Sequence, residues 1–178
     1  MLWPEIVASW GSTAAERAER FPCDRLNPAP DHVLFRAVDV EAPDEVTFRW
    51  LCQLRVAPYS YDKLDNFGRR SPQTLTPGLE QLAPGQRFQT IFRLVEFEPD
   101  RSLTMLSEGP VFGRVACTYR ADPLDQRRSR ILVKVTVVYP EPPLGPLLRF
   151  FGPPGDLVMM RRQLLNLKGL AEQQAVPL

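Results

Sequence analysis

The sequence predicts an α+β domain in which a run of antiparallel strands precedes one long helix. Three patterns support this prediction. Residues 130–139 show the clearest period-two alternation in the chain, as expected of a strand with one covered face. Residues 86–97 and 102–108 flank a proline-containing turn and form a hairpin pattern. Residues 156–174 carry apolar side chains at helical spacing, which predicts a long terminal helix.

The composition limits the classes of partner. The chain has 178 residues, 44% of them hydrophobic, which is enough for one sizeable core. Its 22 Lys and Arg residues nearly balance its 21 Asp and Glu residues, and the net charge is +1. A chain with so little net charge lacks the basic surface typical of nucleic-acid binding, so we expect no nucleic-acid partner.

We expect a cytoplasmic protein without a signal peptide or stable membrane insertion. Residues 1–5 lack a basic and then apolar leader, and no uncharged apolar run is long enough to cross a bilayer. The cysteines, Cys23, Cys52 and Cys117, are odd in number and far apart, which favours buried, reduced thiols. With His32 as the single histidine, the spacing does not fit a metal site, and we predict no metal and no cofactor.

The first part of the chain divides into an arm and the start of the domain. Residues 1–31 form an irregular arm with one short helix, capped by Thr13 and Glu16 in a capping box. Residues 32–178 form the domain itself. Its first strand is expected at 33–40, followed by a helix from Pro43 to about residue 56 and a second short helix over 60–66.

Further strands are expected over 112–121 and 130–139, after the hairpin. Residues 140–155 are rich in proline and predict a connector with unusually apolar content. Asp156 is placed to cap the last helix, which should end near residue 174. Because the strands are grouped together, this helix should cover the apolar face of an antiparallel sheet.

Several segments resemble a known superfamily. They are the strand-to-helix step at 38–46, the Leu-Ala-Pro-Gly-Gln-Arg-Phe segment at 82–88 and the long terminal helix. With them the chain resembles the START-like (SRPBCC) superfamily, also named after polyketide cyclase/dehydrase and birch-pollen allergen, over roughly residues 33–175. Residues 49–62 and 65–72 are similar to an uncharacterised bacterial subgroup of it. The resemblance implies a helix-grip fold, in which a curved antiparallel sheet of about six to seven strands wraps around the C-terminal helix.

A curved sheet and a straight helix do not fit everywhere, so we expect an apolar cavity between them. The expected ligand-binding residues are those that share the inward phase of their strands or helices, together with a polar and aromatic group near the cavity mouth. They are Trp50, Tyr59, Tyr61, Phe92, Leu94, Glu96, Tyr119, Val135, Val137, Met160, Arg161 and Leu164. The competing interpretation is an ordinary core without usable space, because protein interiors are normally close-packed.

Two of these residues form a specific expectation. Glu96 is in phase with Phe92 and Leu94, so an inward Glu96 would be a buried carboxylate that needs a partner. Arg161 could supply that partner beside a polar ligand group. The alternative is an ion pair facing solvent. For Tyr59, Tyr61 and the charged residues up to 70, the alternative to ligand binding is that they hold a glycine turn.

The leading functional hypothesis is a carrier or sensor of a small hydrophobic molecule, such as a lipid, a polyketide-like compound or an aromatic compound. The alternative is a cyclase, aromatase or dehydratase using Tyr, Asp or Arg in the same cavity. We expect binding rather than catalysis, because the sequence offers no obvious general base. A second alternative function is a protein-interaction module in which residues 144–151 bind another protein. The same segment could instead gate the cavity, contact a membrane surface or be buried against the last helix.

Overall fold

Six antiparallel strands form one sheet with the order β1-β6-β5-β4-β3-β2. The computed structural model describes residues 3–175. The strands are β1 (His32–Val40), β2 (Arg87–Phe88), β3 (Phe92–Glu98), β4 (Ser102–Gly109), β5 (Gly113–Pro123) and β6 (Ser129–Val138). The helices are α1 (Glu5–Ser9), α2 (Ala14–Ala18), α3 (Pro22–Leu26), α4 (Asp44–Cys52), the 3-10 turn η1 (Gln53–Arg55), α5 (Asp62–Asp65) and α6 (Leu144–Ala175).

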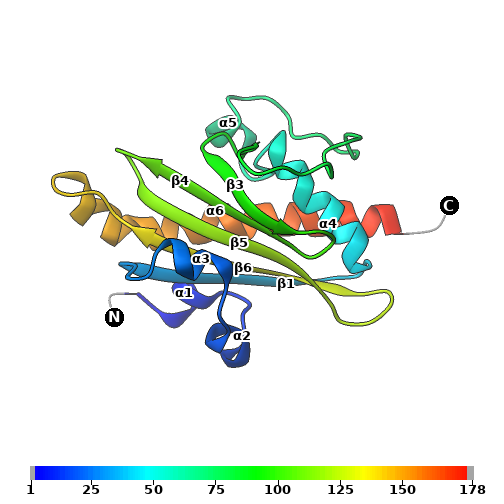
Figure 1. Cartoon of the computed structure of the whole chain (residues 1–178), viewed down its shortest axis with the longest axis horizontal. Helices are drawn as coiled ribbons and strands as arrows, with labels where there is room; N and C mark the ends of the chain where they lie inside the picture. Colours follow the sequence, from blue (N-terminus) through cyan, green and yellow to red (C-terminus); the bar gives the residue numbers. More distant parts are fainter. Residues whose placement is uncertain (1–2, 176–178) are drawn as a thin grey trace.

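The two faces of the sheet are covered by different parts of the chain. Helix α6 runs along the whole inner face, behind the sheet in Figure 1, and the main core lies between them. On the outer face the N-terminal arm packs a smaller cluster, in which Phe21 and Cys23 contact Phe35 and Leu132. The predicted α+β class and helix-grip arrangement are therefore confirmed, with six strands and short helices after β1.

Helix α6 begins twelve residues earlier than the sequence analysis predicts, at Leu144 rather than Asp156. The prediction of a connector over 140–155 is therefore mostly wrong, because residues 144–155 are helical. The prolines on which that prediction rested, Pro153 and Pro154, lie inside the helix. A proline removes the hydrogen bond to the carbonyl four residues before it. Pro154 thus frees the Phe150 carbonyl, and this carbonyl accepts a hydrogen bond from Trp3 Nε1 at 3.0 Å. A partner in the distant N-terminal arm satisfies this turn of the helix.

The arm contains three short helices where the sequence analysis predicts one. The capping box of α2 is confirmed: Thr13 Oγ1 accepts from the Glu16 N–H, and Glu16 accepts from the Thr13 N–H. Glu16 also binds Arg130 of β6, which draws α2 onto the sheet. The arm therefore lies against the domain through both apolar and charged contacts.

The predicted strand 86–97 is interrupted. Gln89 and Thr90 have φ values of 42° and 69°, a left-handed conformation that strands do not contain and that a β-branched Thr seldom adopts. The chain therefore turns between β2 and β3. Within β3 a bulge follows, because Leu94 pairs with Met105 while Glu96 pairs with Thr104, so Val95 is an extra residue.

Within residues 3–175, no helix is long and apolar enough to cross a membrane. Cys23, Cys52 and Cys117 are free and buried, as the sequence predicts. Burial raises the pKa of all three thiols, to about 11 for Cys23 and about 12 for Cys52. These thiols are therefore core side chains and not activated nucleophiles.

Leu164 tests the packing between α6 and the sheet. This side chain is fully buried in the main core, so Leu164→Ala should lower the free energy of unfolding by about 2–5 kcal/mol. Val158 on the same helix is 55% exposed, and Val158→Ala should cost less than about 0.5 kcal/mol. Urea denaturation of both variants gives the comparison, and equal losses would contradict the packing described.

Candidate functional site

A cavity of about 710 Å³ separates the N-terminal half of α6 from the sheet. Its size lies in the range of about 300–1,000 Å³ that is usual for small-molecule sites. Apolar side chains form most of its wall. Five of the residues predicted to bind ligand line it, and they come from β3, β5, β6 and α6: Phe92, Tyr119, Val135, Val137 and Met160.

The rim of this cavity is apolar and exposed. Leu64 and Phe67, in and after α5, are 77% and 83% exposed and line the cavity. Ile91, Phe112 and Phe151 also line it and are at least half exposed. An apolar molecule therefore meets several exposed apolar side chains at the entrance.

Three of the predicted ligand-binding residues belong to the packed core and do not line the cavity. Leu94 and Leu164 are almost completely buried among other core side chains. Trp50 packs edge-on against Tyr59, and its Nε1 donates to Gln174 Oε1 at 2.8 Å. The space under the C-terminal half of α6 is filled by such side chains, so the cavity is confined to the other half.

The predicted pair between Glu96 and Arg161 does not form. The bulge at Val95 turns Glu96 to the outer face, where both of its carboxylate oxygens lie 2.8 Å from Arg25 of α3. Arg161 is exposed, and its guanidinium lies over the Trp10 ring, 5.6 Å from the ring centre. Glu96 thus forms an ion pair that faces solvent, as the alternative interpretation of the sequence expected, although its partner is Arg25 and not Arg161.

Tyr119 is the centre of a hydrogen-bonded chain along the cavity wall. Its hydroxyl accepts from Gln89 Nε2 at 3.1 Å and donates to Gln163 Oε1 at 2.7 Å. Gln163 Nε2 in turn donates to the Pro58 carbonyl at 2.6 Å. This series of hydrogen bonds joins β5, α6 and the segment before α5. Burial raises the pKa of Tyr119 well above its ordinary value, so the phenol stays protonated.

A buried ion pair that the sequence analysis missed lies between β1 and α6. Arg36 is completely buried on the inner face, and its Nη2 lies 2.7 Å from Asp156 Oδ2. Asp156 lines the cavity in the middle of α6, so it is not the N-cap predicted from the sequence. Burial raises the pKa of Asp156, and Arg36 opposes the rise. Removing either partner would leave a buried charge, at a cost of about 3–5 kcal/mol.

Both residues had a signal in the sequence. Arg36 shares its strand face with Leu34, and Asp156 precedes Met160 by four residues on one helix face. Tyr139, at the same end of the cavity, has its hydroxyl 3.2 Å from His32 Nδ1. His32, the first residue of β1, is therefore half-buried against Tyr139.

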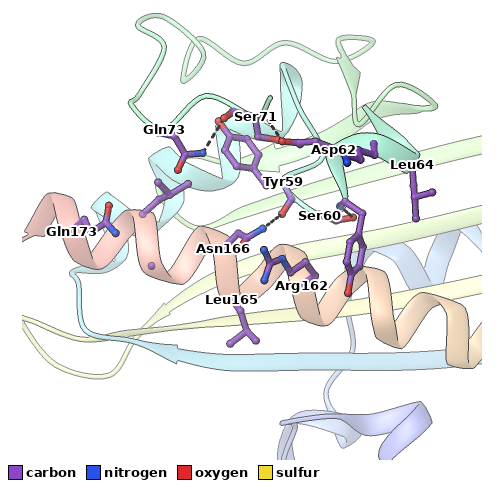
Figure 2. A pocket seen from close by; sticks show the side chains of 14 residues that line it. Tyr59, Ser60, Asp62, Leu64, Ser71, Gln73, Arg162, Leu165, Asn166 and Gln173 are labelled. Carbon is purple, nitrogen blue, oxygen red and sulfur yellow. Dashed lines mark hydrogen bonds between the residues drawn. The ribbon is translucent and has the colours of Figure 1, made fainter. Parts of the chain in front are cut away.

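A second, more polar groove of about 660 Å³ lies along the other flank of α6, against residues 59–73 (Figure 2). The predicted ligand-binding residues Tyr59 and Tyr61 line this groove and not the apolar cavity. Asn166 of α6 donates to the Tyr59 carbonyl at 2.8 Å (Figure 2). Ser60 and Leu64 line both spaces, so α5 separates the groove from the cavity.

Polar side chains in this region mainly hold the backbone. Asp62 accepts from the N–H and the hydroxyl of Ser71, at 2.9 and 2.6 Å (Figure 2). Asn66 Nδ2 donates to the Arg69 carbonyl at 2.7 Å, across Gly68. These contacts fit the alternative named from the sequence, a glycine turn held by its own side chains.

The apolar segment 144–151 forms the first turns of α6, so it cannot be buried against the last helix, as one alternative had it. Leu148 and Phe151 of this segment line the cavity, while Leu144 and Leu147 are exposed.

Among residues 3–175, no three His, Cys, Asp or Glu side chains lie close enough to hold a metal ion.

The arrangement of sheet and helix is similar to solved structures at low sequence identity. A hypothetical protein from Helicobacter pylori matches with a TM-score of 0.53 and 17% identity, over 86% of this chain and 96% of that chain. A protein from Thermobifida fusca matches with a TM-score of 0.50 and 16% identity, over 78% and 94%.

A third match is the di-domain ARO/CYC protein BexL from the BE-7585A biosynthetic pathway, with a TM-score of 0.51 and 12% identity. The match covers 82% of this chain and 48% of that one. The chain has a START-like fold. At these identities the likeness establishes the START-like fold and not an activity. No family model and no curated protein matches the chain.

Tyr119→Phe tests the hydrogen-bonded chain in the cavity wall. The change leaves Gln89 and Gln163 without the hydroxyl that they share, so it should lower the free energy of unfolding by about 1–3 kcal/mol. Tyr61→Phe is the matched control, because the Tyr61 side chain is 39% exposed, and it should change stability by less than about 0.5 kcal/mol. If Tyr119→Phe leaves the free energy of unfolding unchanged in thermal or urea unfolding, these hydrogen bonds do not stabilise the cavity wall.

The buried tyrosines predict a loss of stability at alkaline pH. Burial raises the pKa of Tyr59 and of Tyr139 to about 12, from the ordinary value of 10.0, and it raises the pKa of Tyr119 well above that ordinary value. Above pH 10 the unfolded chain therefore releases phenol protons that the folded chain retains, and unfolding becomes easier as pH rises.

Each such tyrosine should lower the free energy of unfolding by about 1.4 kcal/mol per pH unit in this window. Urea denaturation at about pH 9 and about pH 11 measures the loss, which should be smaller in Tyr139→Phe. A free energy of unfolding that does not change between these two pH values would show that the phenols ionise freely in the folded chain.

Proposed function

We propose that this protein binds a small hydrophobic molecule, such as a lipid, a polyketide-like compound or an aromatic compound, in the cavity between α6 and the sheet, as a carrier or sensor. The single observation that carries the proposal is the cavity of about 710 Å³ with mostly apolar walls and an apolar, exposed rim. Transfer of apolar surface from water into such a space is favourable and needs no specific contact.

The expected affinity is moderate. Burying about 200 Å² of apolar ligand surface contributes on the order of 5 kcal/mol, at about 25 cal/mol per Å². Immobilising the ligand offsets part of this gain. Polar groups in the wall then set the orientation of the ligand more than its affinity.

The alternative function is a cyclase, aromatase or dehydratase in the same cavity. Such an enzyme needs acid and base groups within hydrogen-bonding reach of one another or of the substrate. The hydroxyls of Tyr119 and Tyr139 are hydrogen-bonded to glutamine and histidine side chains, and Asp156 is paired with Arg36. Burial keeps both phenols protonated. Titratable groups thus lie within reach of one another, as an enzyme needs, but phenols that stay protonated cannot act as bases, and this favours binding over catalysis.

The other expectations about partners follow from the same surfaces. The exposed part of 144–151 is a candidate contact for a protein or a membrane surface, and it adjoins the cavity rim. Three free, buried thiols are compatible with a reducing compartment, which supports the proposed cytoplasmic location.

An uncharged fluorophore tests the proposed function. N-phenylnaphthylamine should bind saturably, with one molecule per chain, and its fluorescence should rise in the apolar cavity. Val137 lines the cavity, so Val137→Phe should fill part of it and weaken binding about tenfold, or about 1.4 kcal/mol.

The neighbouring Val138 does not line the cavity, and Val138→Phe should leave the affinity of the probe nearly unchanged. Circular dichroism and unfolding curves check that both variants fold. Binding that is not saturable, or an equal effect of the two variants, would contradict the proposed site.

A further inference from the structure

Asp156 is a cavity-lining carboxylate whose geometry fits a specific ligand contact. It lies on the inner face of α6, four residues before Met160, and both side chains line the cavity. Its Oδ2 is held at 2.7 Å by Arg36 Nη2. Arg36 is itself fully buried and fixed by a hydrogen bond from Nη1 to the Phe35 carbonyl at 2.7 Å. The carboxylate is therefore held in one orientation.

The second oxygen of this carboxylate is open. Among the described residues, none donates a hydrogen bond to Asp156 Oδ1, and 25% of the Asp156 side chain is accessible. Because Asp156 lines the cavity, this accessible part faces the space where a ligand would lie. An ionised carboxylate is an acceptor only, so the position requires a donor from the ligand.

The two tyrosine hydroxyls and the second carboxylate of the cavity wall already have partners or are enclosed. Tyr119 is hydrogen-bonded to Gln89 and Gln163, and the Tyr139 hydroxyl is hydrogen-bonded to His32. At the cavity mouth Asp65 accepts from Ser60, and its other oxygen is enclosed by protein. Among the carboxylate oxygens of the described cavity wall, Asp156 Oδ1 is thus the accessible one without a donor.

The charge of the pair limits the class of donor. Arg36 and Asp156 are together neutral, so the cavity gains nothing from a ligand that brings a net charge into an apolar space. An anionic ligand would face the carboxylate directly, and an ammonium group would lie near the guanidinium of Arg36. A hydroxyl supplies the hydrogen without adding charge.

We propose that the cavity selects hydrophobic molecules that carry a hydroxyl group, and that this hydroxyl donates to Asp156 Oδ1 while Arg36 holds the carboxylate in place. This inference rests on the proposed function, because it concerns the same cavity. It makes Asp156 the residue that determines specificity and Arg36 a positioning residue.

The test is competition against bound N-phenylnaphthylamine by matched compounds. Dodecanol and dodecyl methyl ether have the same chain, but the ether lacks the donor and is the more apolar of the two. Desolvation alone therefore favours the ether. We expect the reverse order, with dodecanol displacing the probe at a concentration lower by about tenfold, as a hydrogen bond to a charged acceptor implies.

Two further ligands test the charge argument. Dodecanoate and dodecylamine should both compete less well than dodecanol. Equal competition by the alcohol and the ether would overturn the proposal while leaving apolar binding in the cavity intact. Stronger competition by the amine than by the alcohol would also overturn it. If the probe itself does not bind, the proposed function fails and this inference fails with it.

Paired variants connect the preference to these residues. Single changes would leave a buried charge, so the informative variant is Arg36→Met with Asp156→Leu, which removes both charges and retains bulk. It should bind the probe but lose the preference for dodecanol over the ether. The matched control is Lys168→Met with Glu172→Leu, another ion pair of α6 that lines neither the cavity nor the groove, and it should keep the preference. If the Arg36 and Asp156 variant still prefers dodecanol to the ether, the assignment of Asp156 as the hydroxyl acceptor is overturned. If that variant does not fold, competition by the four compounds on the wild-type protein decides whether the proposal holds.

Discussion

The mismatch between one long helix and one twisted sheet is the constraint on which the structure depends. Helix α6 has 32 residues, a length of about 48 Å at about 1.5 Å per residue. A sheet twists along such a distance, so a single helix cannot stay in close contact with it throughout. Contact is complete under the C-terminal half of α6, where Leu164 and Leu167 are fully buried. Under the N-terminal half, the same mismatch leaves the cavity.

Polar groups hold the walls of this cavity apart. The chain from Gln89 through Tyr119 to Gln163 connects the sheet to α6 on one side. The Arg36 and Asp156 pair connects them on another. Apolar side chains alone could collapse into the space and reduce its volume, whereas hydrogen-bonded groups resist this because their partners would be lost. A cavity of this kind can therefore persist without a ligand.

The interior of the cavity is also separated from the charged surface of the protein. Most of its ionisable groups are engaged with protein partners, and their burial favours the neutral forms of the tyrosines. The rim, by contrast, is apolar and exposed. This combination favours uptake of uncharged molecules and separates the cavity from the polar groove on the other flank of α6, which contains Lys63 and Arg162. The shared fold does not distinguish a carrier from an enzyme, and the arrangement of these side chains bears on that question more directly.

Local patterns predicted the secondary structure well where one face of an element is buried. The alternation in 130–139 predicted β6, and the spacing after 156 predicted the C-terminal part of α6, because a half-buried strand or helix repeats its apolar residues with its own period. The same reasoning placed Phe92, Val135 and Val137 on the inner face, where they line the cavity.

Local patterns failed where a distant partner or a single extra residue decides the outcome. The prolines at 153 and 154 predict a break, but Trp3 satisfies the Phe150 carbonyl that Pro154 frees.

The extra residue at Val95 reversed the expected direction of Glu96, and no periodicity reveals a bulge in advance. The sequence by itself determined the α+β class, the order of the elements and the apolar inner face, because these follow from short-range periodicity. Only the tertiary structure decided that Arg36 meets Asp156 and that the space beside them stays open, because both depend on how residues 120 positions apart approach one another.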